Sequence, residues 1–253
     1  MSEIKEASLD NLKENYYEIL VNAFIETHYI PGTTFIDGGA NYGLHIPVIL
    51  TNSPQTNHVL AIEPNQELAN YLRKKFNQSN FECLEFALGS SEGNSTFYLN
   101  DQDSGYSSLI IPAGADRSRY REVSVQIETL DRLMHERPGT VSVIKLDLEG
   151  AEFLALKGAS EILMRDRPFI VIEYSTERMR YWSIKPEEFE IFLSKHEYKS
   201  EPIIPDLNAK ECWYLILRPL EKEVSERFVY FRRGIMAGIN HDDVRLFTKL
   251  GIY

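Results

Sequence analysis

The sequence is poor in cysteine and contains no long apolar run. Its two cysteines, Cys83 and Cys212, lie far apart in the chain of 253 residues. This spacing indicates two reduced thiols in strands rather than a disulfide framework. No apolar stretch approaches the roughly 20 residues that span a bilayer. The first 15 residues are polar and of mixed charge, unlike a signal peptide. These absences predict a cytoplasmic protein without a membrane span.

Basic residues are scarce relative to acidic ones. The chain has 27 lysines and arginines against 38 aspartates and glutamates, which gives a formal charge of −11. Nucleic-acid-binding proteins normally present a basic face to the phosphates, and the densest basic group here is only Arg117, Arg119 and Arg121. A nucleic-acid partner is therefore disfavoured.

Metal-ligand spacing is also missing from the sequence. The six histidines are scattered, and no two stand at metal-ligand spacing with a carboxylate, so no metal is predicted. The sequence does not exclude a magnesium ion bound by carboxylates near Asp147. His45 is expected to be a packed side chain rather than a catalytic base.

From residue 33 onward, short apolar segments alternate with amphipathic ones. Strands are expected at residues 33–37, 58–63, 81–86, 95–99, 122–128, 141–147, 168–173 and 212–217. A helix is expected over residues 42–50, and another carries Phe153, Leu156, Ala159 and Leu163 on one face. This alternation predicts an α/β fold, in which a mainly parallel sheet is covered by helices on both faces and binds ligands at the carboxyl ends of its strands.

The length suits one such domain with short additions. We expect an N-terminal helical extension over residues 1–32, the main domain over residues 33–220, and a C-terminal extension of unassigned role over residues 221–253. The sequence does not determine the oligomeric state, and a homo-oligomer is compatible with it.

The segment FIDGGANYG leaves the first strand and provides a candidate cofactor site. Gly38, Gly39 and Gly43 can supply positive φ angles and close backbone approach, and Asp37 ends the strand. A carboxylate there would repel the pyrophosphate of a dinucleotide, whereas a cationic sulfonium compound has no such conflict. Asn41 stands where D-x-G-x-G-x-G would place its middle glycine. The segment favours S-adenosylmethionine over NAD or NADP.

Glu63 ends the second strand, 26 residues after Asp37. An acid at this position is placed to accept hydrogen bonds from two ribose hydroxyls. Its structural alternative is a helix N-terminal acid ahead of Pro64. Because Glu63 occurs together with the glycine turn and Asp37, we expect it to bind the ribose hydroxyls.

The segment VIKLDLEGAE is the candidate acceptor site. Lys145 lies in an apolar strand, so it is expected to pair with a carboxylate such as Asp147 or Glu173, although a lysine base of lowered pKa is the alternative. Methyl transfer to a hydroxyl needs in-line approach and a proton acceptor. Asp147 is the first candidate for orienting the acceptor or taking its proton, followed by Glu149 and Glu173. The choice among the three stays open.

Seven segments occur in an order that resembles the FkbM family of methyltransferases over roughly residues 33–175. They are FIDGGANYG, AIEPN, ALGSSEGNSTFYL, SGYSSL, ETLDRL, IKLDLEGAEFLALKGASEIL and RPFIVIEYS. The resemblance implies the class I methyltransferase fold, a Rossmann-like three-layer sandwich, and S-adenosyl-L-methionine as cofactor. Known family members are mostly O-methyltransferases in natural-product, glycan and lipopolysaccharide pathways, so a hydroxyl on a sugar, glycan or other small molecule is the expected acceptor.

The resemblance also assigns roles to individual residues. It implies that Asp37, Gly39, Asn41 and Gly43 line the methionine part of the cofactor, that Glu63 contacts ribose, and that Asp147 and Glu149 lie at the active site. We add Gly38 to the expected cofactor-binding residues, although the family usually has a small β-branched or apolar residue at this position. SGYSSL, residues 104–109, is expected to cover the cofactor or the acceptor.

Two alternative functions are also compatible with the sequence. One is an NAD(P)-dependent oxidoreductase, and the other is a catalytically inactive methyltransferase fold used as an interaction module. N-methylation also stays open, because either reaction could use carboxylates at these strand ends.

Overall fold

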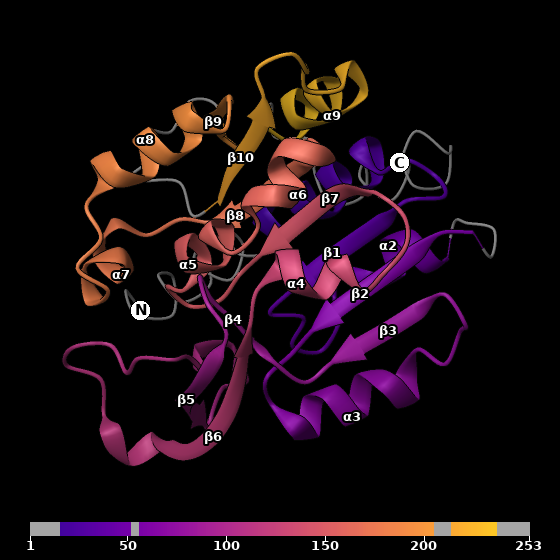
Figure 1. The fold of residues 1–253 in the computed structure, drawn as a ribbon. Helices are drawn as coiled ribbons and strands as arrows, with labels where there is room; N and C mark the ends of the chain where they lie inside the picture. Colours follow the sequence, from indigo (N-terminus) through magenta and orange to yellow (C-terminus); the bar gives the residue numbers. More distant parts are fainter. Residues whose placement is uncertain (1–15, 52–55, 205–213, 237–253) are drawn as a thin grey trace, which may run out of the picture.

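The computed structural model describes residues 16–51, 56–204 and 214–236, which are organised around a seven-stranded sheet (Figure 1). The strands are β1 (Thr34–Gly38), β2 (His58–Ile62), β3 (Phe81–Leu84), β7 (Val141–Leu146), β8 (Phe169–Glu173), β9 (Tyr198–Pro202) and β10 (Tyr214–Pro219). They lie in the order β3-β2-β1-β7-β8-β10-β9. Neighbours among the first five are parallel, and β10 runs antiparallel to both β8 and β9. The predicted mainly parallel sheet is confirmed.

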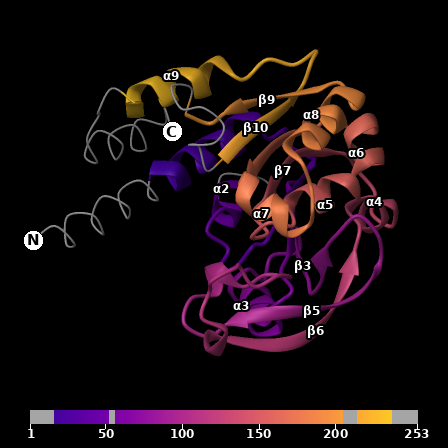
Figure 2. The ribbon, with the colours of Figure 1, turned by 90° about the vertical axis from the view of Figure 1, so that its left-hand side faces the viewer.

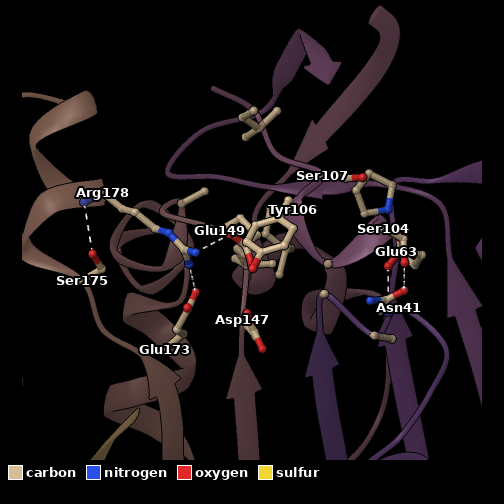
Figure 3. A pocket seen from close by; sticks show the side chains of 18 of the residues that line it. Asn41, Glu63, Ser104, Tyr106, Ser107, Asp147, Glu149, Glu173, Ser175 and Arg178 are labelled. Atoms are coloured by element: carbon tan, nitrogen blue, oxygen red, sulfur yellow. Dashed lines mark hydrogen bonds and ion pairs between the residues drawn. The ribbon is translucent and has the colours of Figure 1, made fainter. Parts of the chain in front are cut away.

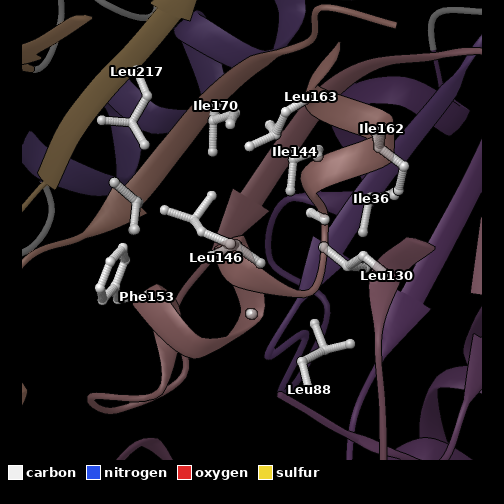
Figure 4. Close-up of a cluster of buried hydrophobic side chains, with 14 of the residues drawn as sticks. Ile36, Leu88, Leu130, Ile144, Leu146, Phe153, Ile162, Leu163, Ile170 and Leu217 are labelled. Atoms are coloured by element: carbon white, nitrogen blue, oxygen red, sulfur yellow. The ribbon is translucent and has the colours of Figure 1, made fainter. Parts of the chain in front are cut away.

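Helices cover both faces of this sheet. They are α2 (Ile46–Leu50), α3 (Gln66–Lys75), α4 (Leu130–His135), α5 (Glu152–Lys157), α6 (Ser160–Arg165), α7 (Thr176–Tyr181), α8 (Pro186–Lys195) and α9 (Glu226–Met236). Residues 16–28 are also helical. Successive strand side chains point to opposite faces, so Phe35 joins a core with residues 16–28, α2, α3 and α9, whereas Ile36 joins one with α4, α5, α6 and α8 (Figure 4). The predicted three-layer class I methyltransferase sandwich is confirmed.

A second, three-stranded sheet follows β3 in the chain. It consists of β4 (Ala87–Leu88), β5 (Gly93–Asn100) and β6 (Tyr120–Glu128), in the order β4-β6-β5. The 3-10 turns η1 (Ser104–Tyr106) and η2 (Arg117–Arg119) lie between β5 and β6. Figures 1 and 2 both place β5 and β6 at the end of the molecule remote from α9. The sequence predicted strands here but not a separate sheet.

Two predicted helices differ from those observed. The helix expected from residue 42 begins at Ile46, because Asn41 and Gly43 adopt φ angles of +46° and +74°, which an α-helix does not allow. The helix expected around residues 153–163 divides into α5 and α6 at Gly158. A Cβ at Gly158 would lie 2.2 Å from the carbonyl oxygen of Gly89, so the close approach of the small sheet requires glycine at the break.

The described parts of both predicted extensions pack on the main sheet. Leu20 and Phe24 share a core cluster with Phe228 and Phe231. The rest of these segments, and Cys212, lie outside the described residues, so the predicted division of the chain stays a prediction. In the described ranges, no helix has the length and apolarity needed to cross a membrane.

Candidate active site

A cavity of about 1310 Å³ lies at the carboxyl ends of β1, β2, β7 and β8. The strand order changes direction between β1 and β7, which is the position where open α/β sheets bind ligands. The η1 segment, the start of α7 and the first residue of β10 complete its walls. Figure 3 shows Glu63 and Asn41 toward one side, and Glu149 and Glu173 toward the other.

The glycine turn contributes its backbone to the cavity wall. Gly39 and Asn41 line the cavity, but Gly38 and Gly43 are not among the lining residues. Gly39 has a φ of +73°, and a Cβ there would lie 1.9 Å from the carbonyl oxygen of Asp147. The packing of the turn on the end of β7 therefore requires glycine at this position.

Glu63 lines the cavity and also holds the glycine turn. Its Oε2 accepts a hydrogen bond from the backbone N–H of Asn41 at 2.8 Å, and its Oε1 accepts one from Asn65 at 2.9 Å. Burial raises the pKa of Glu63 to about 7, although these two backbone hydrogen bonds lower it. The remaining lone pairs of the two oxygens can accept hydroxyl donors.

Lys145 joins the glycine turn to the second half of the site. Its Nζ lies 3.6 Å from Asp37 Oδ1 and 3.6 Å from Asp147 Oδ2, and it donates to the carbonyl oxygen of Gly39. Burial alone would lower the pKa of Lys145, but Asp147 and Asp37 raise it above its ordinary value. The expected ion pair with Asp147 is confirmed, and a lysine that stays protonated cannot serve as a base.

Asp37 is fully buried and is not among the residues that line the cavity. Burial raises the pKa of Asp37, and Lys145 opposes that shift. Neither carboxylate oxygen of Asp37 has a hydrogen bond in the described part of the chain, so Lys145 is its main counterion. Asp37 therefore acts on the cavity through Lys145.

Asp147 lines the cavity, and one of its two carboxylate oxygens is engaged by protein groups. The Tyr214 hydroxyl donates to Oδ2 at 2.7 Å, on the same oxygen that faces Lys145. Among the described residues, no hydrogen bond or ion pair involves Oδ1. Burial opposes ionisation, but Lys145 and Tyr214 hold the pKa of Asp147 below its ordinary value. A charged oxygen is thus available to a ligand hydroxyl.

Glu149 and Glu173 are held together by Arg178 from α7. One Arg178 nitrogen lies 2.7 Å from Glu149 Oε2, and another donates to Glu173 Oε2 (Figure 3). Burial raises the pKa of Glu149 to about 8, against the opposing effect of Arg178. Burial and the neighbouring carboxylates raise the pKa of Glu173 well above its ordinary value. Both carboxyls are therefore stronger bases than exposed glutamates.

Oxygens of Asp147, Glu149 and Glu173 lie within 4.8 Å of one another, a grouping that carboxylate-bound cations use. Each of these carboxylates already contacts a protein donor or cation, either Lys145, Tyr214 or Arg178.

His45 is buried, as expected for a packed side chain. Its Nδ1 lies 2.8 Å from Asn22 Oδ1, and its Nε2 lies 3.2 Å from Glu18 Oε2. Burial and the Lys145 charge lower the pKa of His45 to about 3. Both ring nitrogens face protein groups, so His45 organises the cavity wall and is not a base candidate.

The match to known proteins covers most of this site. A family model described as the methyltransferase FkbM domain matches residues 37–200, which is more than half of the chain. The chain belongs to the FkbM methyltransferase family. The sequence resemblance is thereby confirmed, and no curated protein matches this sequence.

Three solved structures illustrate what this FkbM family member is similar to. Methyltransferase FkbM from Methylobacillus flagellatus is 17% identical, with 75% of this chain and 44% of that chain covered and a TM-score of 0.48. A TehB-like SAM-dependent methyltransferase from Corynebacterium glutamicum is 13% identical, with coverages of 84% and 97% and a TM-score of 0.40. A Streptococcus mutans protein in complex with SAH is 11% identical, with coverages of 79% and 95% and a TM-score of 0.45. The match thus spans less than half of the Methylobacillus protein.

The FkbM-family site contains residues that sequence reasoning missed. Arg178 lies on a helix that was not predicted, although Ser175 followed by Glu177 is a helix-start pattern that could have revealed it. Tyr214 comes from β10, beyond the matched domain, and its contact with Asp147 bridges 67 residues. Side chains of this kind become visible only when the fold brings distant strands together.

Proposed function

We propose that this FkbM-family protein transfers a methyl group from S-adenosylmethionine to a hydroxyl of an uncharged small molecule or sugar. The observation that supports it best is the charge of the cavity. Seven acidic side chains line it, against the two ion-paired cations Lys145 and Arg178, so the wall becomes strongly negative once Glu63 and Glu149 have lost their protons, above about pH 8. Such a wall repels a dinucleotide pyrophosphate and attracts a sulfonium cation.

The residues present fit the cofactor. The backbone of Gly39 and Asn41 would border its methionine part, and Glu63 would accept hydrogen bonds from its ribose hydroxyls. Glu63 is suited to this role because it is buried, lines the cavity and is fixed by two backbone N–H groups. Asp37 would contribute indirectly, by holding Lys145 against Asp147.

The carboxylate cluster would bind and deprotonate the acceptor. When bound, S-adenosylmethionine supplies an electrophilic methyl group on a positively charged sulfur. Asp147 orients the acceptor hydroxyl through Oδ1, since Oδ2 is held by Tyr214 and Lys145. Glu149 would accept the proton of the acceptor hydroxyl while that oxygen is methylated. A pKa near 8 matches Glu149 to this task.

The acidic wall also restricts the acceptor. A phosphorylated or otherwise polyanionic molecule would be repelled, so this proposal includes neutral hydroxyl acceptors and excludes nucleic acid. A cytoplasmic location also belongs to the proposal and rests on the sequence composition.

Calorimetric titration with S-adenosylhomocysteine, run beside NAD and NADP, tests the cofactor. We expect micromolar binding of the homocysteine compound alone, with loss of affinity in Glu63→Ala. The exposed Glu67→Ala, on α3, serves as a matched control that keeps full affinity. Binding of a dinucleotide instead would rule the proposal out.

A further inference from the structure

The η1 turn ties the small sheet to the cofactor side of the cavity. The Ser104 hydroxyl donates to Asn41 Oδ1 at 2.8 Å, across 63 residues of sequence. The backbone N–H of Asn41 in turn donates to Glu63 Oε2 at 2.8 Å. A continuous chain of hydrogen bonds therefore leads from η1 to the carboxylate that the proposed function assigns to ribose (Figure 3).

The η1 turn is fixed by hydrogen bonds of its own. The Asp103 carboxylate accepts from the Gly105 N–H at 3.0 Å. Asn100 Oδ1 accepts from the Asp103 N–H, and the Asn100 N–H donates to the Ser107 hydroxyl. Because the turn is held in this way, the Ser104 hydroxyl is presented to the glycine turn without a large ordering cost.

Asn41 departs from glycine in a way that fits this contact. Its φ is +46°, in the left-handed region that asparagine tolerates better than most residues. Glycine would adopt this backbone more easily, but it has no side chain to accept from Ser104. The side chain of Asn41 thus makes a contact with Ser104 that the middle glycine of a D-x-G-x-G-x-G turn could not make.

On these grounds, and resting on the proposed function, we propose that Ser104 is a positioning residue for cofactor binding. Its hydroxyl orients Asn41 and so keeps the Asn41 N–H on Glu63. The same turn carries Tyr106, which is 53% exposed and lines the same cavity. The turn that carries Ser104 therefore also contributes an aromatic side chain to the wall of this cavity (Figure 3).

The test is calorimetric titration with S-adenosylhomocysteine of the wild type, Ser104→Ala and Ser104→Thr. Loss of one hydrogen bond should weaken binding about threefold to tenfold in Ser104→Ala. The threonine variant retains the hydroxyl and should bind like the wild type. Ser91→Ala, at an exposed serine near the start of β5, is the control that should change nothing.

A double-mutant cycle separates positioning from a general structural effect. In the Asn41→Gly background, Ser104→Ala should have no further effect on the affinity, because its partner side chain is already gone. An equal loss in both backgrounds, or a wild-type affinity in Ser104→Ala, would overturn the assignment while leaving the proposed function intact. Failure of the wild type to bind S-adenosylhomocysteine would overturn both.

Discussion

Glu149→Gln should change how the stability of the protein depends on pH. Burial raises the pKa of the Glu149 carboxyl from 4.5 to about 8, with Arg178 opposing the shift. Between these values the folded protein holds a proton that the unfolded chain has released. The resulting stabilisation is complete below about pH 4.5 and is lost as the pH rises through about 8.

The size of the effect follows from the shift. Each pKa unit corresponds to about 1.4 kcal/mol, so the full interval corresponds to about 5 kcal/mol. Arg178 and Glu173 share the charge of the cluster and can readjust when Glu149 ionises. We therefore expect a measured effect of about 2–5 kcal/mol.

Urea denaturation of the wild type and Glu149→Gln at pH 5, 6, 7 and 8 measures it directly. The glutamine variant cannot ionise, so its free energy of unfolding should gain about 2–3.5 kcal/mol on the wild type between pH 5 and pH 8, which is the part of the full interval that this window covers. Glu67→Gln, at a side chain that is 83% exposed, should show no such gain. Parallel pH curves for the wild type and Glu149→Gln would refute the raised pKa and with it the role of Glu149 as the base.

Three further substitutions test separate contacts. Glu63→Gln should weaken the binding of S-adenosylhomocysteine about 10- to 100-fold by calorimetry, and unchanged affinity would remove Glu63 from the site. Tyr214→Phe should lower the free energy of unfolding by about 1.5–3 kcal/mol, and by less in an Asp147→Asn background. Gly39→Ala should cost at least about 3 kcal/mol, whereas Gly32→Ala, with a similar φ of +86° and open space around it, should cost about 1 kcal/mol.

The sheet and its ligand-binding edge could be predicted because they depend on local patterns. Runs of apolar residues marked every strand of the main sheet except β9, whose sequence YKSEP is polar. The strand ends then placed Glu63, Asp147, Glu149 and Glu173 around one cavity. These positions follow from chain order alone, since the carboxyl ends of parallel strands meet at one edge.

The partners of these residues could not be predicted, because they depend on packing between distant segments. Asp37 was expected to line the cofactor site directly, but the pairing of β1 with β7 sets it against Lys145, away from the cavity wall. The Ser104 contact with Asn41 spans 63 residues and requires the small sheet to fold over the turn. No periodicity in the sequence encodes such contacts.

The most direct test of the central claim is a crystal structure with S-adenosylhomocysteine. It should show the ribose hydroxyls on the Glu63 carboxylate, the homocysteine part beside Gly39 and Asn41, and the sulfur atom directed toward Asp147 and Glu149. Cofactor and acceptor groups would then share one cavity. A complex with the ribose away from Glu63, or with the sulfur directed away from the Asp147 side, would contradict the proposed site.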